Sequence, residues 1–249
     1  MAKKGHNYKQ KRLSVSPVRH LARKENTWTI KQYPGAHTGE SSVPIAFVLR
    51  EMLHIAATMK EAKHILDKGQ VQVDGVVVKE AKHAVGLFDS ISIPEMKKHF
   101  ILAYDMKGRL VVKEADAKAV AQKIGRVVRK NVSVGNKFQI QTHDGYTYKN
   151  ADAKIHVGDS VIVNLKEGKI VDHMPMHKGN SVYIIGGTHV GEVAKVEGIV
   201  EGTMKRDKLV DLSEGKERFQ TTAQNVMVIN DQMLSWMKQV LHVNGGNKQ

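Results

Sequence analysis

The sequence contains no cysteine, few aromatic residues and no long apolar run. Without cysteine the chain can form no disulfide bond and can hold no metal ion through thiolates. No segment approaches the roughly 18 to 20 apolar residues that a membrane-spanning helix needs, and the N-terminus lacks the apolar stretch of a secretory signal. Because aromatic residues make up only 5% of the chain, we expect its cores to consist of Val, Ile, Leu, Met and Ala.

Acidic residues are also scarce, since 25 Asp and Glu stand against 39 Lys and Arg among the 249 residues. The formal net charge of +14 favours a polyanionic partner, either nucleic acid or an acidic membrane surface. The excess lies in residues 1–42, with nine basic residues against two acids, and in residues 95–177, with fifteen against nine. Residues 43–94 are balanced at six and six, so RNA binding there depends on the arrangement of the charges. We expect a cytoplasmic protein with a nucleic-acid partner.

Residues 1–42 show no apolar periodicity and are predicted to form a basic N-terminal arm. One interpretation is a solvated tail. The other is an arm that becomes ordered along phosphates, with Trp28 or Tyr33 packing or stacking. In the second interpretation the basic residues of the arm are candidate RNA contacts, namely Lys3, Lys4, Lys9, Lys11, Arg12, Arg19, His20, Arg23 and Lys24.

Residues 43–94 predict a helix-turn-helix-hairpin domain. An apolar stripe predicts a first helix over residues 44–57. Thr58 and Glu61 fit a capping box that starts a second helix, which ends at Lys68-Gly69.

A hairpin and a closing strand follow the second helix. Asp74-Gly75 stands between two valine-rich runs and predicts a type I′ turn of two residues. Residues 86–93 predict the strand that closes the domain, and Pro94 ends it.

Residues 95–177 predict a mostly β central domain, a small barrel or strongly curved sheet. One helix is expected over residues 116–124, before Gly125. The expected strands cover residues 99–104, 109–113, 137–142, 160–165 and 169–172.

Residues 178–230 predict a five-stranded, SH3-like barrel, and residues 231–249 a C-terminal helix and tail. The stretch over residues 178–194, a strand, a glycine-rich turn and a second strand, resembles a KOW motif, in which Gly186, Gly187 and Gly191 would adopt positive φ and let RNA approach the backbone. A phosphate-binding loop is excluded, because no Lys-Ser/Thr pair follows the glycines at a helix start. The expected strands cover residues 182–185, 191–200, 208–212, 218–220 and 226–229.

The domain over residues 43–93 resembles the small RNA-binding module shared by the fourth small-subunit ribosomal protein, several RNA-modifying enzymes and some tRNA synthetases. The alternative is an ordinary domain of two helices and a hairpin, whose lysines only aid solubility. For the KOW-like stretch the alternative is a tight hairpin without a partner. In the resembling module basic side chains meet phosphates, and the matching residues here are Arg50, Lys60, Lys63, Lys68 and Lys79.

With both features in this order, nearly the whole chain resembles one family, the archaeal and eukaryotic type of small ribosomal subunit protein four. The stretches over residues 85–94, 104–109, 142–144 and 168–173 carry the resemblance most clearly, and residues 179–191 match as well. The family's N-terminal signature is only partly present at His20 to Trp28, where its proline is missing. The resemblance implies a structural, non-catalytic α+β protein of several domains that binds small-subunit rRNA beside neighbouring ribosomal proteins.

The middle and C-terminal segments supply further candidate contacts. The predicted partners include no membrane, no small-molecule substrate and no second copy of the chain. A free-standing RNA chaperone, or a transcription or assembly factor, is the alternative function. The additional candidate RNA contacts are Arg126, Arg129, Lys130, Lys178 and His189.

Catalysis is not expected, although RNA-modifying enzymes carry the same helical module. Pseudouridine synthases place a catalytic aspartate after a Gly-Arg-Leu triplet, but here Val111 follows Gly108-Arg109-Leu110. The chain also has no βαβ pattern for a nucleotide-binding domain, and its thirteen histidines form no H-E-x-x-H motif. We therefore predict no catalytic residue, no cofactor and no metal site.

Overall fold

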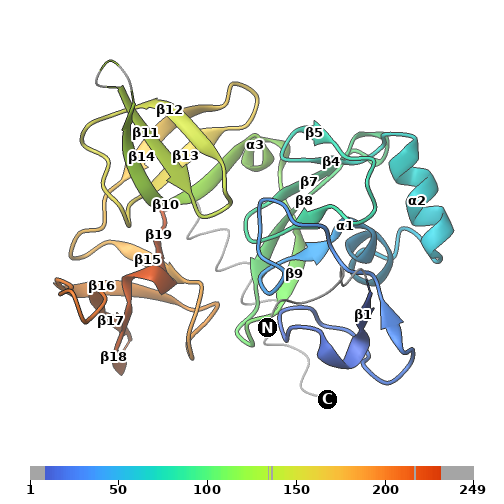
Figure 1. The fold of residues 1–249 in the computed structure, drawn as a ribbon, viewed down its shortest axis with the longest axis horizontal. Helices are drawn as coiled ribbons and strands as arrows, with labels where there is room; N and C mark the ends of the chain where they lie inside the picture. The colour runs from blue at the N-terminus through green and yellow to red at the C-terminus, as the bar shows by residue number, and fades with distance from the viewer. Residues whose placement is uncertain (1–8, 134, 136, 216, 231–249) are drawn as a thin grey trace, which may run out of the picture. The chain divides into compact units, whose positions relative to one another are not determined.

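The computed structural model describes residues 9–133, 135, 137–215 and 217–230. Within these ranges the chain forms two compact units, one of residues 9–102 and 109–120 and the other of residues 103–108 and 121–230. Both units are mostly β with few helices (Figure 1). The C-terminal helix predicted over residues 231–249 lies outside the described residues.

The main sheet of the first unit has five strands in the order β5-β4-β7-β8-β9 (Figure 1). Asp74 and Gly75 join β4 to β5 with φ of +50° and +78°, which confirms the predicted type I′ turn. The sheet continues beyond the domain boundary expected after Pro94, because β8 pairs with β7 and β9 follows β8. The strands are β4 (Gln72–Val73), β5 (Val76–Val77), β7 (Ser90–Ile93), β8 (Lys98–Tyr104) and β9 (Leu110–Glu114).

The first predicted helix is shorter than expected. It consists of α1 (Ile45–Phe47) and a π-helical turn over Val48–Met52. The predicted span to residue 57 is wrong, because the Leu53 N–H donates to the Val48 carbonyl at 2.9 Å and the chain then leaves the helix at His54, which has φ +52°. The predicted apolar stripe is nevertheless buried over most of its length.

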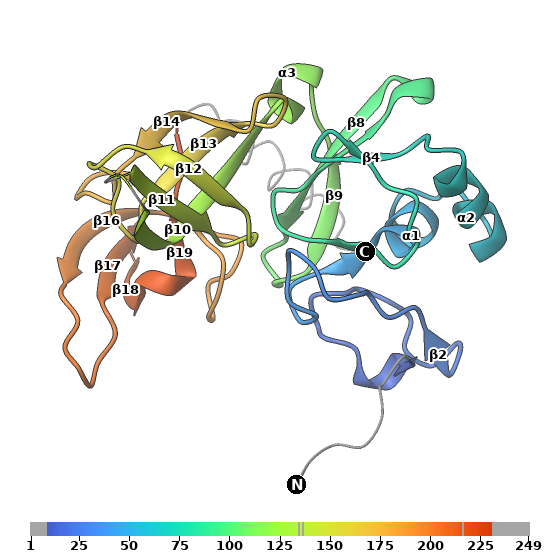
Figure 2. The same cartoon turned by 45° about the horizontal axis from the view of Figure 1, so that its top comes forward.

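The second predicted helix is confirmed as α2 (Met59–Asp67), which packs with α1 (Figure 2). Its capping box is complete: the Glu61 N–H donates to the Thr58 hydroxyl oxygen at 3.3 Å, and the Thr58 N–H donates to the Glu61 carboxylate at 3.4 Å. Ala62 and Leu66 are fully buried. The other face of α2 is therefore the one that carries charge to the surface.

The described part of the N-terminal arm, residues 9–42, is folded onto the first unit. Strands β1 (Gln10–Lys11) and β2 (Trp28–Thr29) pair antiparallel, and β3 (Val43–Pro44) pairs with β6 (Ala84–Val85). This arrangement differs from both interpretations of the arm, because buried polar groups rather than an apolar period hold the segment in place.

One of these polar contacts joins His37 to Asp89. The His37 Nε2 atom lies 2.9 Å from the Asp89 carboxylate, and both side chains are buried. Gly86 leaves room for the imidazole, since a Cβ there would lie 2.5 Å from the His37 ring. The contact fastens the N-terminal segment to the loop that leads into β7.

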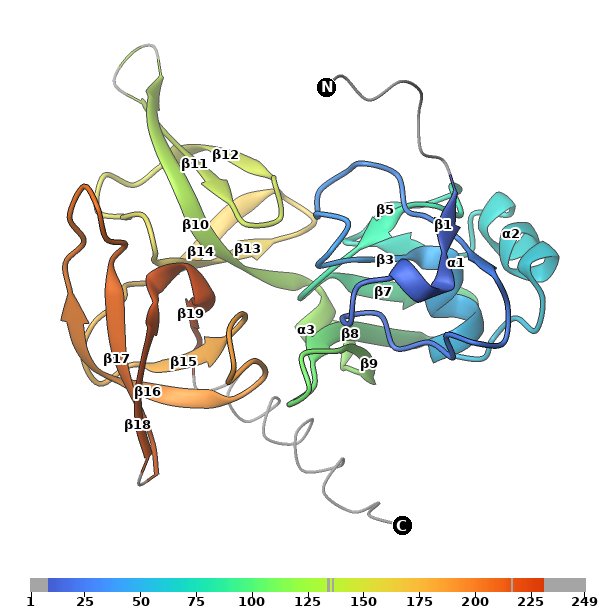
Figure 3. The ribbon, with the colours of Figure 1, turned by 60° about the horizontal axis from the view of Figure 1, so that its bottom comes forward.

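The second unit contains a sheet in the order β12-β11-β10-β13-β14. Figure 3 shows β10 as one long strand that also forms the hairpin with β11. The core of this sheet is a cluster around Val127, Ile140 and Val161. The strands are β10 (Gln122–Ser133), β11 (Lys137–Thr142), β12 (Thr147–Ala151), β13 (Ser160–Asn164) and β14 (Lys169–Met174).

The helix predicted over residues 116–124 is largely wrong. Only α3 (Ala117–Val120) is helical, and β10 begins two residues later. Ile124 pairs with Ile162 of β13. Gly125, which was expected to end the helix, lies inside the strand, where a Cβ would approach the Thr142 side chain to 3.0 Å. Strand pairing and burial therefore override the local helical pattern.

The second sheet of this unit has the order β18-β17-β16-β15-β19, and each of the five strands predicted here is present. Gly187 and Gly191 have the expected positive φ, but Gly186 does not. The space beside Gly191 is filled by the protein itself, since a Cβ there would lie 2.5 Å from the Asp105 carbonyl oxygen. The strands are β15 (Ser181–Ile184), β16 (Val193–Val200), β17 (Leu209–Glu214), β18 (Glu217–Thr222) and β19 (Val226–Val228).

A buried tyrosine in β15 provides a test of this packing. The Tyr183 hydroxyl donates to the Tyr104 carbonyl and accepts from the Tyr104 N–H, each at 3.0 Å. Burial raises the pKa of Tyr183 and keeps the phenol protonated. Tyr183→Phe leaves both backbone groups without that partner, so we expect the free energy of unfolding to fall by about 1–3 kcal/mol in urea titrations. Tyr33→Phe, at an exposed tyrosine, is the control and should change little; equal stability of the two variants would contradict the prediction.

Candidate nucleic-acid interface

The predicted basic residues of the first domain are largely at the surface. Lys60 and Lys63 are exposed on α2, Lys68 is exposed at its C-terminal end, and Lys79 is exposed just after the hairpin. All four side chains are therefore accessible to a polyanion. Arg50 is less available, because its guanidinium lies 2.6 Å from the Glu51 carboxylate and is half-buried.

Two of the six acids of the same charge-balanced segment are buried, and Glu51 and Glu61 are engaged at the surface, whereas Asp67 and Glu80 are exposed. Asp74 is buried and accepts from the Ser90 N–H at 2.9 Å, and Asp89 is buried against His37. The Glu61 carboxylate is engaged at the start of α2, where the backbone N–H of Ala57, and then the Thr58 hydroxyl and N–H, lower its pKa. The solvent-exposed part of this segment therefore has a positive net charge, although the segment as a whole is balanced at six basic and six acidic residues.

Two arginines of the arm are buried instead of facing solvent. Arg19 donates to the Ile30 carbonyl at 2.9 Å and to the Gln32 side chain, and its guanidinium lies 5.5 Å from the Phe47 ring centroid. Burial lowers the pKa of Arg19 to about 10. Arg12 is also buried and lies 3.5 Å from Glu25. Their geometry favours a role inside the protein over contact with phosphates.

The remaining candidate RNA contacts of the arm are either outside the described residues or exposed to solvent. Lys3 and Lys4 lie outside the described residues. The others are exposed on the folded segment: Lys9, Lys11, His20, Arg23 and Lys24.

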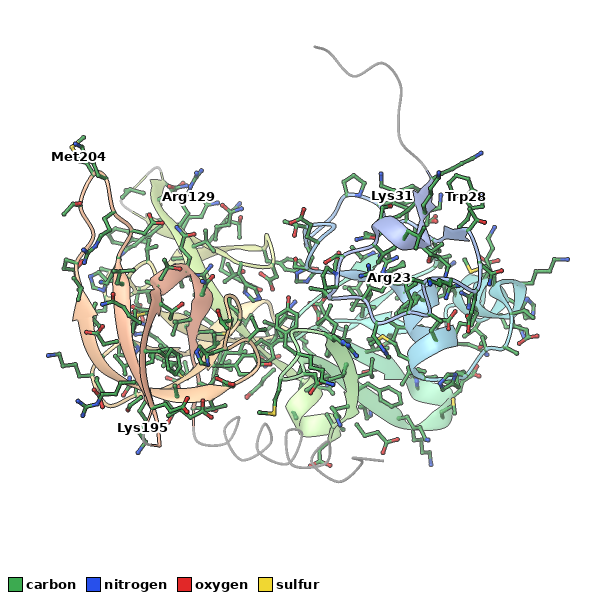
Figure 4. The ribbon with its side chains drawn as sticks, turned by 90° about the horizontal axis from the view of Figure 1, so that it is seen from below. Arg23, Trp28, Lys31, Arg129, Lys195 and Met204 are labelled. Carbon is green, nitrogen blue, oxygen red and sulfur yellow. The ribbon has the colours of Figure 1, made fainter. Side chains whose placement is uncertain are left out.

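The candidates of the second unit are in mixed environments. Arg129 and Lys178 are exposed (Figure 4 labels Arg129). Lys130 donates to the carbonyls of Ala153 and Ile155 at 2.6 and 2.7 Å, so its ammonium is already engaged within the protein.

Arg126 and His189 likewise have internal contacts. Arg126 is partly buried, which lowers its pKa, and it donates to the Ala223 carbonyl at 3.3 Å. His189 lies 2.8 Å from the Glu192 carboxylate and stacks on Phe219 with ring centroids 4.1 Å apart. Sequence reasoning could not anticipate the contacts with Ala223 and Phe219, because these partners are distant in the sequence, whereas Glu192 is only three residues from His189.

The Gly108-Arg109-Leu110 triplet lies at a turn before a strand. Gly108, with φ +69°, turns the chain so that Arg109-Leu110 leads into β9, as expected for a turn that enters a strand. In the part of the chain that the structure describes, no three His, Asp or Glu residues are grouped so as to hold a metal ion. No helix among these residues is long and apolar enough to cross a membrane.

With exposed lysines and arginines on two mostly β units, the chain belongs to the class of β-rich proteins with a basic surface. Known proteins narrow this class. A family model described as ribosomal family S4e matches residues 96–170. Small ribosomal subunit protein eS4 from Methanococcus vannielii is 35% identical over 237 residues, which cover 92% of this chain and 96% of that protein. The same protein from Archaeoglobus fulgidus is 33% identical over 220 residues, 88% of this chain and 92% of the relative.

A solved structure agrees with these relatives. The crystal structure of the 30S ribosomal protein S4e from Thermoplasma acidophilum matches with a TM-score of 0.66 and 32% identity, covering 76% of this chain and 95% of that one. The chain belongs to the S4e family of ribosomal proteins, as its sequence resemblance indicated.

Proposed function

We propose that this chain is a structural constituent of the small ribosomal subunit that binds rRNA without catalysis and supports subunit assembly and translation. The observation that carries the proposal is its relation to eS4 proteins over more than nine tenths of its length. Neighbouring ribosomal proteins are its further partners, and the cytoplasmic ribosome is its location. Co-sedimentation of the tagged protein with small subunits in a high-salt sucrose gradient tests the role; stoichiometric co-migration is expected, and salt-labile or substoichiometric association would contradict it.

Within that role we propose a division of labour along the chain. The exposed lysines of α2 and the hairpin contact phosphates of irregular rRNA, together with the exposed cations of residues 9–24 and with Arg129 and Lys178. Residues 178–230 act as an SH3-like barrel of KOW type, supported by the five antiparallel strands and by the tight turn at Gly191. Residues 231–249 would add the C-terminal helix.

The contribution of α2 can be measured with a double variant. Lys60→Gln together with Lys63→Gln should reduce the slope of log K against log salt by about 2, because each lysine neutralises about one phosphate. Both side chains are exposed, so circular dichroism should report an unchanged fold. The matched control is Lys166→Gln with Lys169→Gln, two exposed lysines at the β13–β14 turn. An unchanged slope in the α2 double variant would remove α2 from the interface, and an equal loss in both variants would show that α2 contributes no more than other exposed lysines.

A further inference from the structure

Two exposed aromatic side chains lie beside lysines on the folded N-terminal segment. Trp28 in β2 is 54% exposed and Tyr33 is 44% exposed. The Lys9 Nζ atom lies 5.8 Å from the Trp28 ring centroid, and the Lys82 Nζ atom lies 4.8 Å from that of Tyr33. Single exposed aromatic residues are ordinary. Here two exposed aromatic rings each lie close to a lysine ammonium, so the surface offers both stacking faces and positive charge.

Two adjoining hollows connect these aromatic residues. The smaller has a volume of about 290 Å³ and is lined by Trp28, Lys9 and Lys31, among others. The larger, of about 1130 Å³, is lined by Tyr33 and again by Lys31. Lys82 lines both. Figure 4 shows Trp28 and Lys31 close together on this segment. We call Lys9, Trp28, Lys31, Tyr33 and Lys82 the aromatic-lysine patch.

The electrostatics of the patch favour an anionic ligand. Among the described residues that line the two hollows, Glu40 is the only acid, against the three lysines of the patch. The nearby Glu25 carboxylate is directed to Arg12, at 3.5 Å. A ligand with negative charge at regular intervals therefore gains from several cations at once.

The patch is held in shape by the backbone. Trp28 is paired with Lys11 across the β1–β2 ladder. The Tyr33 N–H donates to the Lys82 carbonyl at 2.9 Å, so the second aromatic residue and its lysine are joined through the main chain. A ligand that fits such a preformed surface loses less free energy to ordering than one that binds a free arm.

We propose that the aromatic-lysine patch binds unpaired RNA nucleotides, whose bases stack on Trp28 and Tyr33 while their phosphates meet Lys9, Lys31 and Lys82. In duplex RNA the faces of the bases are covered by their neighbours, whereas unpaired bases can be splayed out and stacked on aromatic side chains. Exposed aromatic rings beside lysines therefore suit unpaired nucleotides better than duplex RNA. The inference rests on the proposed function and adds to it a site and the conformation of the RNA.

Fluorescence can test the stacking contact directly. The chain has two tryptophans, Trp28 and Trp236, so the full-length Trp236→Phe protein reports on Trp28 alone. An eight-nucleotide oligoadenylate is expected to quench this emission, because a stacked base lies against the indole. An abasic ribose-phosphate oligomer of the same length carries the same charge and should leave the emission nearly unchanged. Equal quenching by the two oligomers, or none by either, would overturn the stacking proposal.

Variants separate this site from the rest of the interface. Trp28→Ala with Tyr33→Ala should weaken oligoadenylate binding about tenfold or more, within the range for lost base stacking. Met204→Ala, at a fully exposed residue of the second unit, is the control and should bind like the parent. If small-subunit rRNA binds the parent and the double variant equally, the patch does not contribute to binding but the proposed function stands. If rRNA binds neither of these proteins, the patch proposal and the proposed function are both wrong.

The assembled subunit distinguishes RNA from a protein occupant. In the Trp236→Phe protein labelled with 5-hydroxytryptophan, which is excited apart from the tryptophans of other proteins, acrylamide quenching at position 28 should be reduced by naked small-subunit rRNA as strongly as by incorporation into subunits. Protection in subunits without protection by naked rRNA would mean that a neighbouring protein covers the patch, and would overturn the RNA assignment.

Discussion

Binding of the full chain to small-subunit rRNA is expected to weaken steeply as salt is raised. Phosphate contacts release counterions, so log K falls by roughly 0.7 to 0.9 per neutralised phosphate for each unit of log salt. With about six contacts, affinity should drop roughly a thousandfold between 50 and 200 mM monovalent salt. Filter binding over a KCl series at constant Mg²⁺ measures this slope.

The expected salt dependence is attributed in part to identified exposed lysines. The lysines of α2 and the hairpin belong to a segment in which two of the six acids, Asp74 and Asp89, are buried. The Lys60 and Lys63 double variant therefore serves as the internal standard, since it should retain a smaller but still negative slope. A binding constant that stays flat between low and moderate salt would rule out phosphate neutralisation as the main source of affinity.

Lys123→Met is expected to destabilise the second unit strongly. Lys123 and Asp144 form an ion pair at 2.9 Å in which both side chains are 2% exposed. Removing the ammonium leaves a buried carboxylate without its counter-ion, so the free energy of unfolding should fall by about 3–5 kcal/mol. Urea unfolding at pH 7 measures the change. Lys169→Met, which removes an exposed pair with Glu167, should cost less than about 1 kcal/mol.

The pH dependence of that effect follows from Asp144. Burial alone would raise its pKa, but the charge of Lys123 is the first of several contacts that hold the pKa below its ordinary value. A depressed folded-state pKa stabilises the protein above the ordinary value of about 3.9. That stabilisation is lost as the pH falls through the folded-state pKa. The stability gap between wild type and Lys123→Met should therefore narrow in acid, and a gap independent of pH would show that the pair is not its cause.

Local signals in the sequence predicted the elements whose geometry is set by neighbouring residues. The capping box at Thr58 and Glu61 and the turn at Asp74-Gly75 were both confirmed, because each depends on backbone groups only a few residues away. The strands that end at such turns were found for the same reason. Family membership was likewise evident from short stretches in the middle of the chain.

Elements set by distant residues were missed. Gly125 was expected to end a helix, but it lies inside β10, where pairing with β13 decides the conformation. The fold of residues 9–42 depends on polar contacts such as His37 with Asp89, which are 52 residues apart. Such a contact cannot be predicted from the spacing of apolar residues in the sequence. The lengthening of the first sheet by β8 and β9 is also a matter of long-range pairing.

The candidate interface shows the same division between local and distant information. The exposure of Lys60 and Lys63 follows from helix periodicity and was predicted. The burial of Arg19 does not, since its guanidinium is held by Ile30, Gln32 and Phe47. In a polar stretch of sequence, a buried arginine cannot be distinguished from a solvent-exposed one. Charge alone therefore overstated the number of arm residues available to RNA.

The contact between His37 and Asp89 also fixes an order of events during synthesis. The N-terminal segment cannot complete its fold until the chain has been extended by the 52 residues that separate the two side chains. At translation rates of about 5–20 residues per second, this delay is roughly 3 to 10 s. During that interval Arg12 and Arg19 belong to a cationic segment whose fold is not yet complete. The nascent chain therefore offers Arg12 and Arg19 to polyanions only before the segment has folded, whereas Lys9, Lys11, His20, Arg23 and Lys24 remain exposed afterwards.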